Sequence, residues 1–132
     1  MIAFEHVGKR YGGRFEALAD INFRVERGEM LFLTGHSGAG KSSLLRLIMR
    51  LERPSRGRVL VAGHDLDQLH ISQVPYYRRQ IGVVFQDHQL LFDRDIFANV
   101  ALPLTIQGVE PGDAARRVRA ALDKVGLLHR ER

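Results

Sequence analysis

One segment constrains the fold of this chain more than any other: residues 35–42 read Gly-His-Ser-Gly-Ala-Gly-Lys-Ser, which fits the pattern G-x-x-x-x-G-K-[ST]. An apolar run at 30–34 precedes the pattern and suits a strand that is buried on both faces. After it, Leu44, Ile48 and Leu51 recur at the spacing of an amphipathic helix. The sequence therefore predicts a strand, a glycine-rich loop and a helix in this order.

The residue types of this loop are those that bind phosphate groups. Glycines let the backbone adopt positive φ and bring successive N–H groups close to an anion at the start of a helix. Lys41 supplies a positive charge for the β- and γ-phosphates, and the Ser42 hydroxyl supplies a ligand for a bridging Mg²⁺. A nucleoside triphosphate site is therefore predicted. Its binding residues are Gly35, His36, Ser37, Gly38, Ala39, Gly40, Lys41, Ser42 and Ser43.

Three points about this loop stay open in the sequence. The whole segment also fits a glycine-rich turn between a strand and a helix that holds no ligand. Ser43 also fits an ordinary position in the first turn of the helix. His36 has two interpretations, contact with a nucleotide or contact with its own backbone, and the sequence does not decide between them.

The first part of the chain predicts a small antiparallel sheet. Ile2, Phe4 and Val7 alternate with polar residues, and the segment 21–25 alternates again, so each strand has one apolar face. A turn at 11–13, which contains two glycines, lies between the two strands. Beyond the loop, the pattern predicts a strand at 59–62, short helices within 65–79, a buried strand at 81–85 and a helix that begins after Pro111 and ends at Gly126.

Composition excludes several classes of protein. The chain of 132 residues contains no cysteine, which excludes disulfides and thiolate metal sites, and its six histidines show no metal-ligand spacing. No stretch is long enough to cross a bilayer and no signal-like leader follows Met1, so we expect a cytoplasmic protein. The net charge of +5 fits nucleic acid or an anionic membrane surface. Its basic residues are scattered without interleaved aromatic residues, so we expect no nucleic-acid partner.

Three landmarks follow one another along the chain: Tyr11, the loop at 35–42, and Val-Phe-Gln-Asp at 84–87. Their order resembles the A-loop, Walker A and Q-loop of the ATP-binding subunits of ABC transporters, and the resemblance covers essentially the whole chain. It implies an α/β fold of the P-loop NTPase type, with a RecA-like core and an N-terminal antiparallel β subdomain. It further implies a division into residues 1–86, the β subdomain and P-loop core, and 87–132, the start of a helical subdomain.

Differences from the common family pattern point to one subgroup of the family. The loop has His36 and Ala39 where the family commonly has Pro and Ser. The loop sequence, together with Phe-Gln-Asp-His at 85–88 and Ala-Leu-Asp-Lys-Val-Gly-Leu at 121–127, resembles the bacterial cell-division members of the family. Lipoprotein-releasing and macrolide-export ATPases are the nearest alternatives.

The resemblance assigns further roles to matching residues. Tyr11 would stack on adenine, and Gln86 would contact Mg²⁺ or the attacking water, which makes it the expected catalytic residue and a second metal ligand beside Ser42. Each has a second interpretation, because Tyr11 also fits an aromatic residue covering the small sheet and Gln86 also fits the polar end of a buried strand. The expected cofactors are ATP and Mg²⁺. The expected partners are a second ATPase subunit in a homodimer and a transmembrane subunit that holds the ATPase peripherally on the inner face of the cell membrane.

Other family motifs do not occur in these 132 residues. The chain contains no Leu-Ser-Gly-Gly, and no acidic residue follows an apolar strand in the manner of Walker B. Hydrolysis needs groups that orient water and surround the transferring phosphoryl group with charge. We therefore expect an N-terminal portion of an ABC ATPase, truncated before the signature and Walker B motifs, that does not hydrolyse ATP alone. A regulatory or degraded nucleotide-binding fragment is the alternative.

Overall fold

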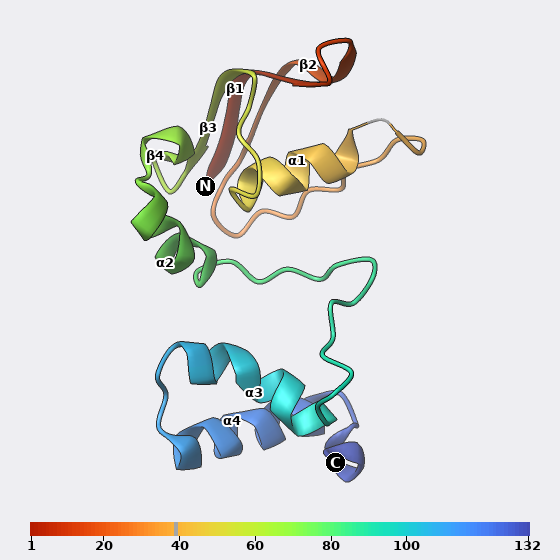
Figure 1. Ribbon diagram of the computed structural model, residues 1–132, viewed down its shortest axis with the longest axis vertical. Helices are drawn as coiled ribbons and strands as arrows, with labels where there is room; N and C mark the ends of the chain where they lie inside the picture. The colour runs from red at the N-terminus through yellow and green to blue at the C-terminus, as the bar shows by residue number, and fades with distance from the viewer. Residues whose placement is uncertain (39) are drawn as a thin grey trace. The chain divides into compact units, whose positions relative to one another are not determined.

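The computed structural model describes residues 1–38 and 40–132, so the predicted binding residue Ala39 lies outside the described residues. The chain divides into two compact units, Met1–Ile81 and Gly82–Arg132 (Figure 1). The subdomain boundary that we predict after Gln86 stays a prediction.

The first unit contains a four-stranded antiparallel sheet. Its strands are β1 (Ile2–Tyr11), β2 (Phe15–Val25), β3 (Arg56–Val61) and β4 (His64–Asp65), in the spatial order β2-β1-β3-β4. The predicted N-terminal antiparallel sheet is therefore confirmed, with β1 in the interior between β2 and β3.

An irregularity in β1 explains why its apolar spacing is not strictly alternate. Phe4 and Val7 are three positions apart, yet both are buried. The pairing register with β2 shifts between them, and His6 adopts a positive φ of 50° at that point. Such a bulge returns the next side chain to the same face of a sheet. Both side chains therefore belong to one core.

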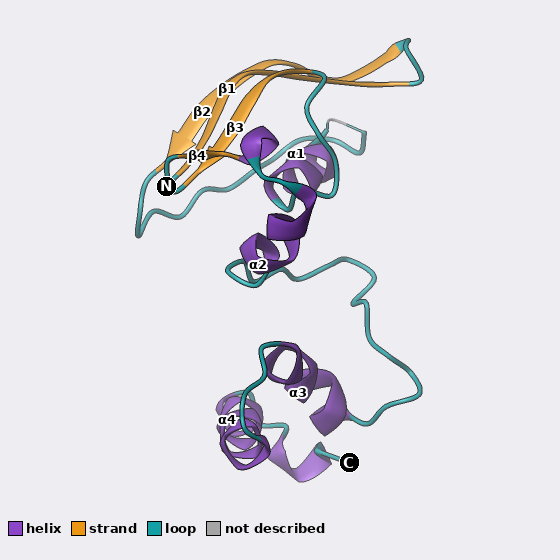
Figure 2. Ribbon diagram, turned by 60° about the vertical axis from the view of Figure 1, so that its left-hand side comes forward, coloured by secondary structure: helices purple, strands orange, loops and turns teal. Residues whose placement is uncertain are grey.

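Helix α1 (Lys41–Ile48) covers one face of this sheet (Figure 2). Of the predicted apolar stripe, Leu44 is buried and Ile48 is partly buried, whereas Leu51 lies beyond the helix and is 49% exposed. Leu44 and Leu47 are one helical turn apart and both are buried. They join Phe4, Val7, Leu18, Val59 and Leu66 in a single core cluster. The predicted helix after the glycine-rich loop is thus confirmed, and its first turn is fixed against β1, β2 and β3.

The segment predicted to form short helices does so. It contains the 3₁₀ turns η1 (Leu66–Gln68) and η2 (Ile71–Gln73), followed by the one-turn helix α2 (Val74–Arg78). The predicted strand at 59–62 is also confirmed as β3, although β3 begins earlier, at Arg56.

Two predicted strands are wrong in this structure. The segments 30–34 and 81–85 have no assigned secondary structure, and neither pairs with another strand among the described residues. Met30 is 80% exposed and Phe32 is 81% exposed. An apolar run makes burial favourable, but a strand also needs a neighbour that satisfies its N–H and C=O groups. No described segment offers these two runs that neighbour.

The second unit is a helical hairpin. It consists of α3 (Ile96–Ile106), α4 (Pro111–Lys124) and the 3₁₀ turn η3 (Leu128–Arg130). Ala114, Val118 and Leu122 recur at four-residue spacing along α4 and are buried, so the predicted last helix is confirmed. Within residues 1–38 and 40–132, no helix combines the length and the apolar character needed to span a bilayer.

Candidate functional site

The glycine-rich loop leads directly into the N-terminus of α1. Gly35, His36, Ser37 and Gly38 are exposed, and Gly40 is the residue that precedes the helix. Within the described residues, no side chain caps the first turn of α1. The first N–H groups of a helix carry a partial positive charge and lack partners within the helix. The end of this loop is therefore a place where an anion would be stabilised.

Lys41 folds back over the loop that precedes it. Its ammonium group donates hydrogen bonds to the carbonyl oxygens of Gly35 and of His36, the latter at 2.8 Å. Two successive carbonyl groups at the start of the loop thus accept from the same lysine nitrogen. The cation is held where the motif predicts phosphates, and its partners here are neutral carbonyl groups.

Gly40 is required by a close approach as well as by its backbone conformation. Its φ is 92°, in the region that favours glycine. A Cβ atom at this position would come within 2.7 Å of Leu18 Cδ2 and still closer to the carbonyl oxygen of Ala17. The end of the loop therefore lies directly against β2, a contact that the motif alone did not predict.

The two serines that follow Lys41 have different environments. The Ser42 side chain is exposed at the start of α1, so its hydroxyl is accessible to a ligand. Ser43 is buried, and its Oγ lies 3.2 Å from the hydroxyl of Tyr11. Ser43 thus joins the helix to β1 rather than facing the solvent.

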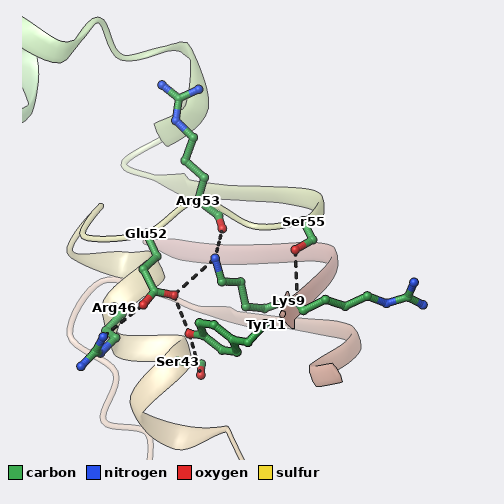
Figure 3. A network of polar contacts seen from close by, with 8 residues as sticks. Lys9, Tyr11, Ser43, Arg46, Glu52, Arg53 and Ser55 are labelled. Atoms are coloured by element: carbon green, nitrogen blue, oxygen red, sulfur yellow. Dashed lines mark hydrogen bonds and ion pairs between the residues drawn. The ribbon is translucent and has the colours of Figure 1, made fainter. Parts of the chain in front are cut away.

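The structure brings Tyr11 to the first turn of α1. Its hydroxyl donates a hydrogen bond to Glu52 Oε2 at 2.5 Å, in addition to the contact with Ser43 (Figure 3). Lys9 Nζ lies 5.0 Å from the centre of the tyrosine ring, a cation–π contact. The predicted base-stacking residue and the loop helix therefore lie side by side, although they are separated by about thirty positions in the sequence.

The carboxylate of Glu52 is the centre of this group of polar side chains. It accepts hydrogen bonds from Tyr11 and from Arg46 Nη1, the latter at 3.1 Å, and lies 3.3 Å from Lys9 Nζ. The hydrogen bond from the Tyr11 hydroxyl, with those from Arg46 and Lys9, holds the pKa of Glu52 below its usual range, although partial burial opposes this. Glu52 is therefore ionised at neutral pH.

Sequence reasoning did not single out Lys9, Arg46 or Glu52. One signal for Lys9 was present, because residues two apart on a strand share a face and Lys9 precedes Tyr11 by two. Glu52 follows the end of α1, and no spacing rule connects it to β1. Only the folding of the helix onto the sheet brings it to Tyr11.

Gln86 lies in the second unit. It is exposed, in a turn of the segment that precedes α3. The backbone N–H of His88 donates to the carbonyl of Phe85 at 3.2 Å across this turn. The loop, α1 and Tyr11 all belong to the first unit.

Comparisons with known proteins assign this sequence to a family. The family model described as ABC transporter matches residues 18–132. The chain is 58% identical over 128 residues to the cell division ATP-binding protein FtsE of Escherichia coli, covering 97% of this chain and 58% of that protein. FtsE of Haemophilus influenzae is 49% identical over 131 residues, which is 98% of this chain and 60% of the relative. The chain thus spans about three fifths of the length of these relatives.

A solved structure gives the same answer for the fold. The ATP-binding cassette MJ0796, in a dimeric post-hydrolysis state bound to ADP and phosphate, superposes with a TM-score of 0.84 at 28% identity. The match covers 93% of this chain and 56% of that one. The predicted P-loop NTPase fold class is therefore confirmed. Because the family model matches most of the chain, we conclude that the chain belongs to the ABC transporter family, and within that family it is similar to FtsE proteins.

Proposed function

We propose that this chain binds ATP with Mg²⁺ at the loop 35–42 and the first turn of α1. The observation that carries the proposal is the arrangement at that turn: the Lys41 ammonium lies against the loop, Ser42 is exposed, and the hydroxyl of Tyr11 contacts Ser43. A cation, a hydroxyl and an aromatic ring match the phosphates, the metal and the base of a nucleotide. The ADP and phosphate bound to the related cassette support the same assignment.

The donor set fits the expected ligand. Gly38 and Gly40 have φ values of 82° and 92°, so the backbone at these two residues can turn N–H groups toward an anion. Lys41 would exchange its carbonyl partners for phosphate oxygens, which carry full negative charge. Mg²⁺ would neutralise part of the phosphate charge and would take the Ser42 hydroxyl as a ligand. Gln86 is proposed as the second residue that contacts the metal or the attacking water.

Lys41→Ala tests the proposal directly. Replacement should weaken Mg-ATP affinity by about 1.5–3 kcal/mol, the usual contribution of a hydrogen bond to a charged group. Titration calorimetry measures this difference. Lys124→Ala is the matched control, because Lys124 is exposed at the end of α4 in the other unit and should leave the affinity unchanged. Equal affinities of the wild type and Lys41→Ala would contradict the assignment.

For the full-length protein, we propose the role carried by the names of its relatives. An FtsE-like ATPase would form a homodimer around ATP and would couple ATP binding and hydrolysis to an FtsX-like transmembrane subunit in bacterial cell division. It would be cytoplasmic and held peripherally at the inner face of the cell membrane. The identity to two FtsE proteins and the dimeric state of the related cassette support this role. A lipoprotein-releasing or macrolide-type ABC transporter, or a nucleotide-binding fragment without hydrolysis, is the alternative.

The segment after Gln86 supplies a candidate contact with that subunit. Asn99 fixes its backbone, because the side chain of Asn99 accepts from the Leu91 N–H at 2.8 Å and donates to the Leu91 carbonyl at 3.0 Å. Phe92 follows immediately and is 96% exposed. A fixed backbone that presents a bare aromatic ring is typical of a binding surface. We therefore assign Phe92 to the interface with the membrane subunit.

Phe92→Ala in the full-length protein should weaken binding of the membrane subunit by roughly 1–2 kcal/mol, as loss of an aromatic anchor does. Co-purification and titration of the detergent-solubilised subunit measure it. Val125→Ala is the control, because Val125 is also apolar and exposed in the same unit. Mg-ATP affinity should stay unchanged in both variants. If Phe92→Ala leaves the complex as stable as Val125→Ala does, the interface lies elsewhere.

A further inference from the structure

Tyr11 is held from two directions by charged groups that no sequence motif connects to it. Its hydroxyl donates to Glu52 Oε2 at 2.5 Å, and the ammonium of Lys9 lies over its ring (Figure 3). Lys9 is itself anchored, because it donates to the carbonyl oxygen of Arg53 at 2.8 Å and pairs with Glu52 at 3.3 Å. The carboxylate of Glu52 therefore contacts both the Tyr11 hydroxyl and the Lys9 ammonium, the two groups that hold the ring in place.

Burial makes these contacts effective. The Lys9 and Glu52 side chains are only 14% and 19% exposed. Charges that are largely removed from water interact strongly and must be paired. Arg46, which approaches the other carboxylate oxygen, is 58% exposed and is the outermost member of the group. The Lys9–Glu52 pair is thus a fixed support, whereas the ring of Tyr11 stays half-buried and keeps part of its surface accessible.

The geometry points to Glu52 as a positioning residue that orients the Tyr11 ring for base stacking. This inference rests on the proposed ATP site. Stacking of a base on an aromatic ring depends on the orientation of the ring, and a ring that is already fixed loses less conformational freedom when the ligand binds. Glu52 fixes the ring at its hydroxyl and, through Lys9, at one face. Part of the Tyr11 residue stays exposed, so a base can reach the ring.

Two ligands separate this role from general support of the fold. Mg-ATP contacts both the phosphate loop and the base platform, whereas magnesium tripolyphosphate has no base. Glu52→Ala should weaken Mg-ATP binding on the order of tenfold, within the range of one lost base-stacking contact, and leave tripolyphosphate affinity unchanged. Isothermal titration of the full chain with both ligands gives the two affinities.

A double-mutant cycle tests whether Glu52 acts through Tyr11. If it does, Glu52→Ala should cause no further loss of ATP affinity in a Tyr11→Ala background. Glu52→Gln should restore part of the affinity, because an amide oxygen still accepts a hydrogen bond from the hydroxyl. Tyr11→Phe, which keeps the ring and removes only the hydroxyl, should reproduce part of the effect of Glu52→Ala, because the Lys9–Glu52 pair remains. This variant decides the question if Glu52→Ala does not fold.

Each contrary result has a distinct meaning. Equal weakening of ATP and tripolyphosphate would overturn the positioning role and would assign Glu52 to support of the phosphate loop. Additive losses in the cycle, or an unchanged ATP affinity in Tyr11→Phe, would also overturn it. Absence of binding of both ligands to the wild type would overturn the proposed ATP site and this inference with it. ATP binding that depends on Lys41 but not on Glu52 would overturn this inference alone.

Discussion

At the scale of single residues, Gly40 serves two requirements at once. The phosphate-loop pattern requires a glycine there so that the backbone can approach an anion. The structure adds the contact with β2, where the Ala17 carbonyl and the Leu18 side chain occupy the space that a Cβ atom would need. Gly38 has a similar φ of 82°, but a Cβ atom at that position would meet nothing within 4 Å. A side chain at Gly38 would therefore meet only backbone strain, whereas a side chain at Gly40 would meet both backbone strain and a steric clash.

Gly38→Ala should lower the free energy of unfolding by about 1–2 kcal/mol, the cost of a left-handed conformation for a residue with a side chain. Gly40→Ala should lower it by about 1–3 kcal/mol more, because β2 must shift to accept the methyl group. Urea unfolding followed by circular dichroism measures both differences. Equal losses in the two variants would show that the contact with Ala17 and Leu18 does not constrain the loop.

The sequence predicted much of the candidate site at this scale, but not the contacts between its residues. The types and order of Lys41, Ser42 and Tyr11 follow from motifs, because phosphate and base recognition restricts the residue types. Their contacts follow from tertiary structure. The Tyr11 hydroxyl contacts Ser43 and donates a hydrogen bond to Glu52 because α1 folds onto the sheet. Partners so far apart in sequence carry no local pattern that a single sequence could reveal.

At the scale of elements, the C-terminus of α1 is held by α2. The last carbonyl groups of a helix lack partners within it. The Tyr77 hydroxyl donates to the backbone carbonyl of Ile48 at 2.5 Å. The Arg78 guanidinium donates to the backbone carbonyls of Met49, from Nε at 3.0 Å, and of Arg50, from Nη2 at 2.8 Å. The helix that carries the phosphate loop at one end is thus fixed by α2 at the other.

Tyr77 makes this docking sensitive to alkaline pH. Burial raises the pKa of its hydroxyl to about 12, against 10.0 for an unperturbed tyrosine. The folded state therefore favours the protonated form. The resulting stability is fully present below pH 10.0 and is lost as pH rises toward about 12, because the unfolded chain releases this proton first. Thermal unfolding temperatures should fall through that window.

Tyr77→Phe removes the titrating group and should flatten this part of the pH profile, at some cost in stability from the lost hydrogen bond to Ile48. Tyr76→Phe is the control, since the Tyr76 side chain is 64% exposed and should leave the profile unchanged. Absorbance of tyrosinate records the ionisation itself. A profile that is identical in the wild type and Tyr77→Phe would contradict this account.

The elements that sequence reasoning predicted correctly are those stabilised by local patterns. The hairpin β1–β2 has β-branched and aromatic residues on both sides of a glycine turn, and α1 and α4 have helical apolar stripes. The strands predicted at 30–34 and 81–85 rest on short apolar runs alone. Buried parallel strands depend on neighbours from distant parts of a chain, and nothing within a run of apolar residues specifies that such neighbours are present.

At the scale of the whole molecule, both units expose large apolar side chains. Phe32 and Met30 in the first unit are about four-fifths exposed, and in the second unit Val84 is 94% exposed. Contiguous exposed apolar residues usually mark a surface that contacts other protein, or a liability for aggregation. The segments that carry them are the same two runs that the sequence predicted as buried strands. The apolar runs therefore mark surfaces whose burial against another protein surface would be favourable.

We therefore expect the 132-residue chain by itself to bind a hydrophobic dye and to self-associate as its concentration rises. Phe32→Ser should reduce dye binding and association, because it removes an exposed ring that contributes nothing to the core cluster. Light scattering at low and high salt distinguishes the cause: association driven by the net charge of +5 would respond to screening, whereas apolar association should persist or increase in salt. A monodisperse monomer with one sharp calorimetric transition, and no dye binding, would show that these apolar segments are covered in solution.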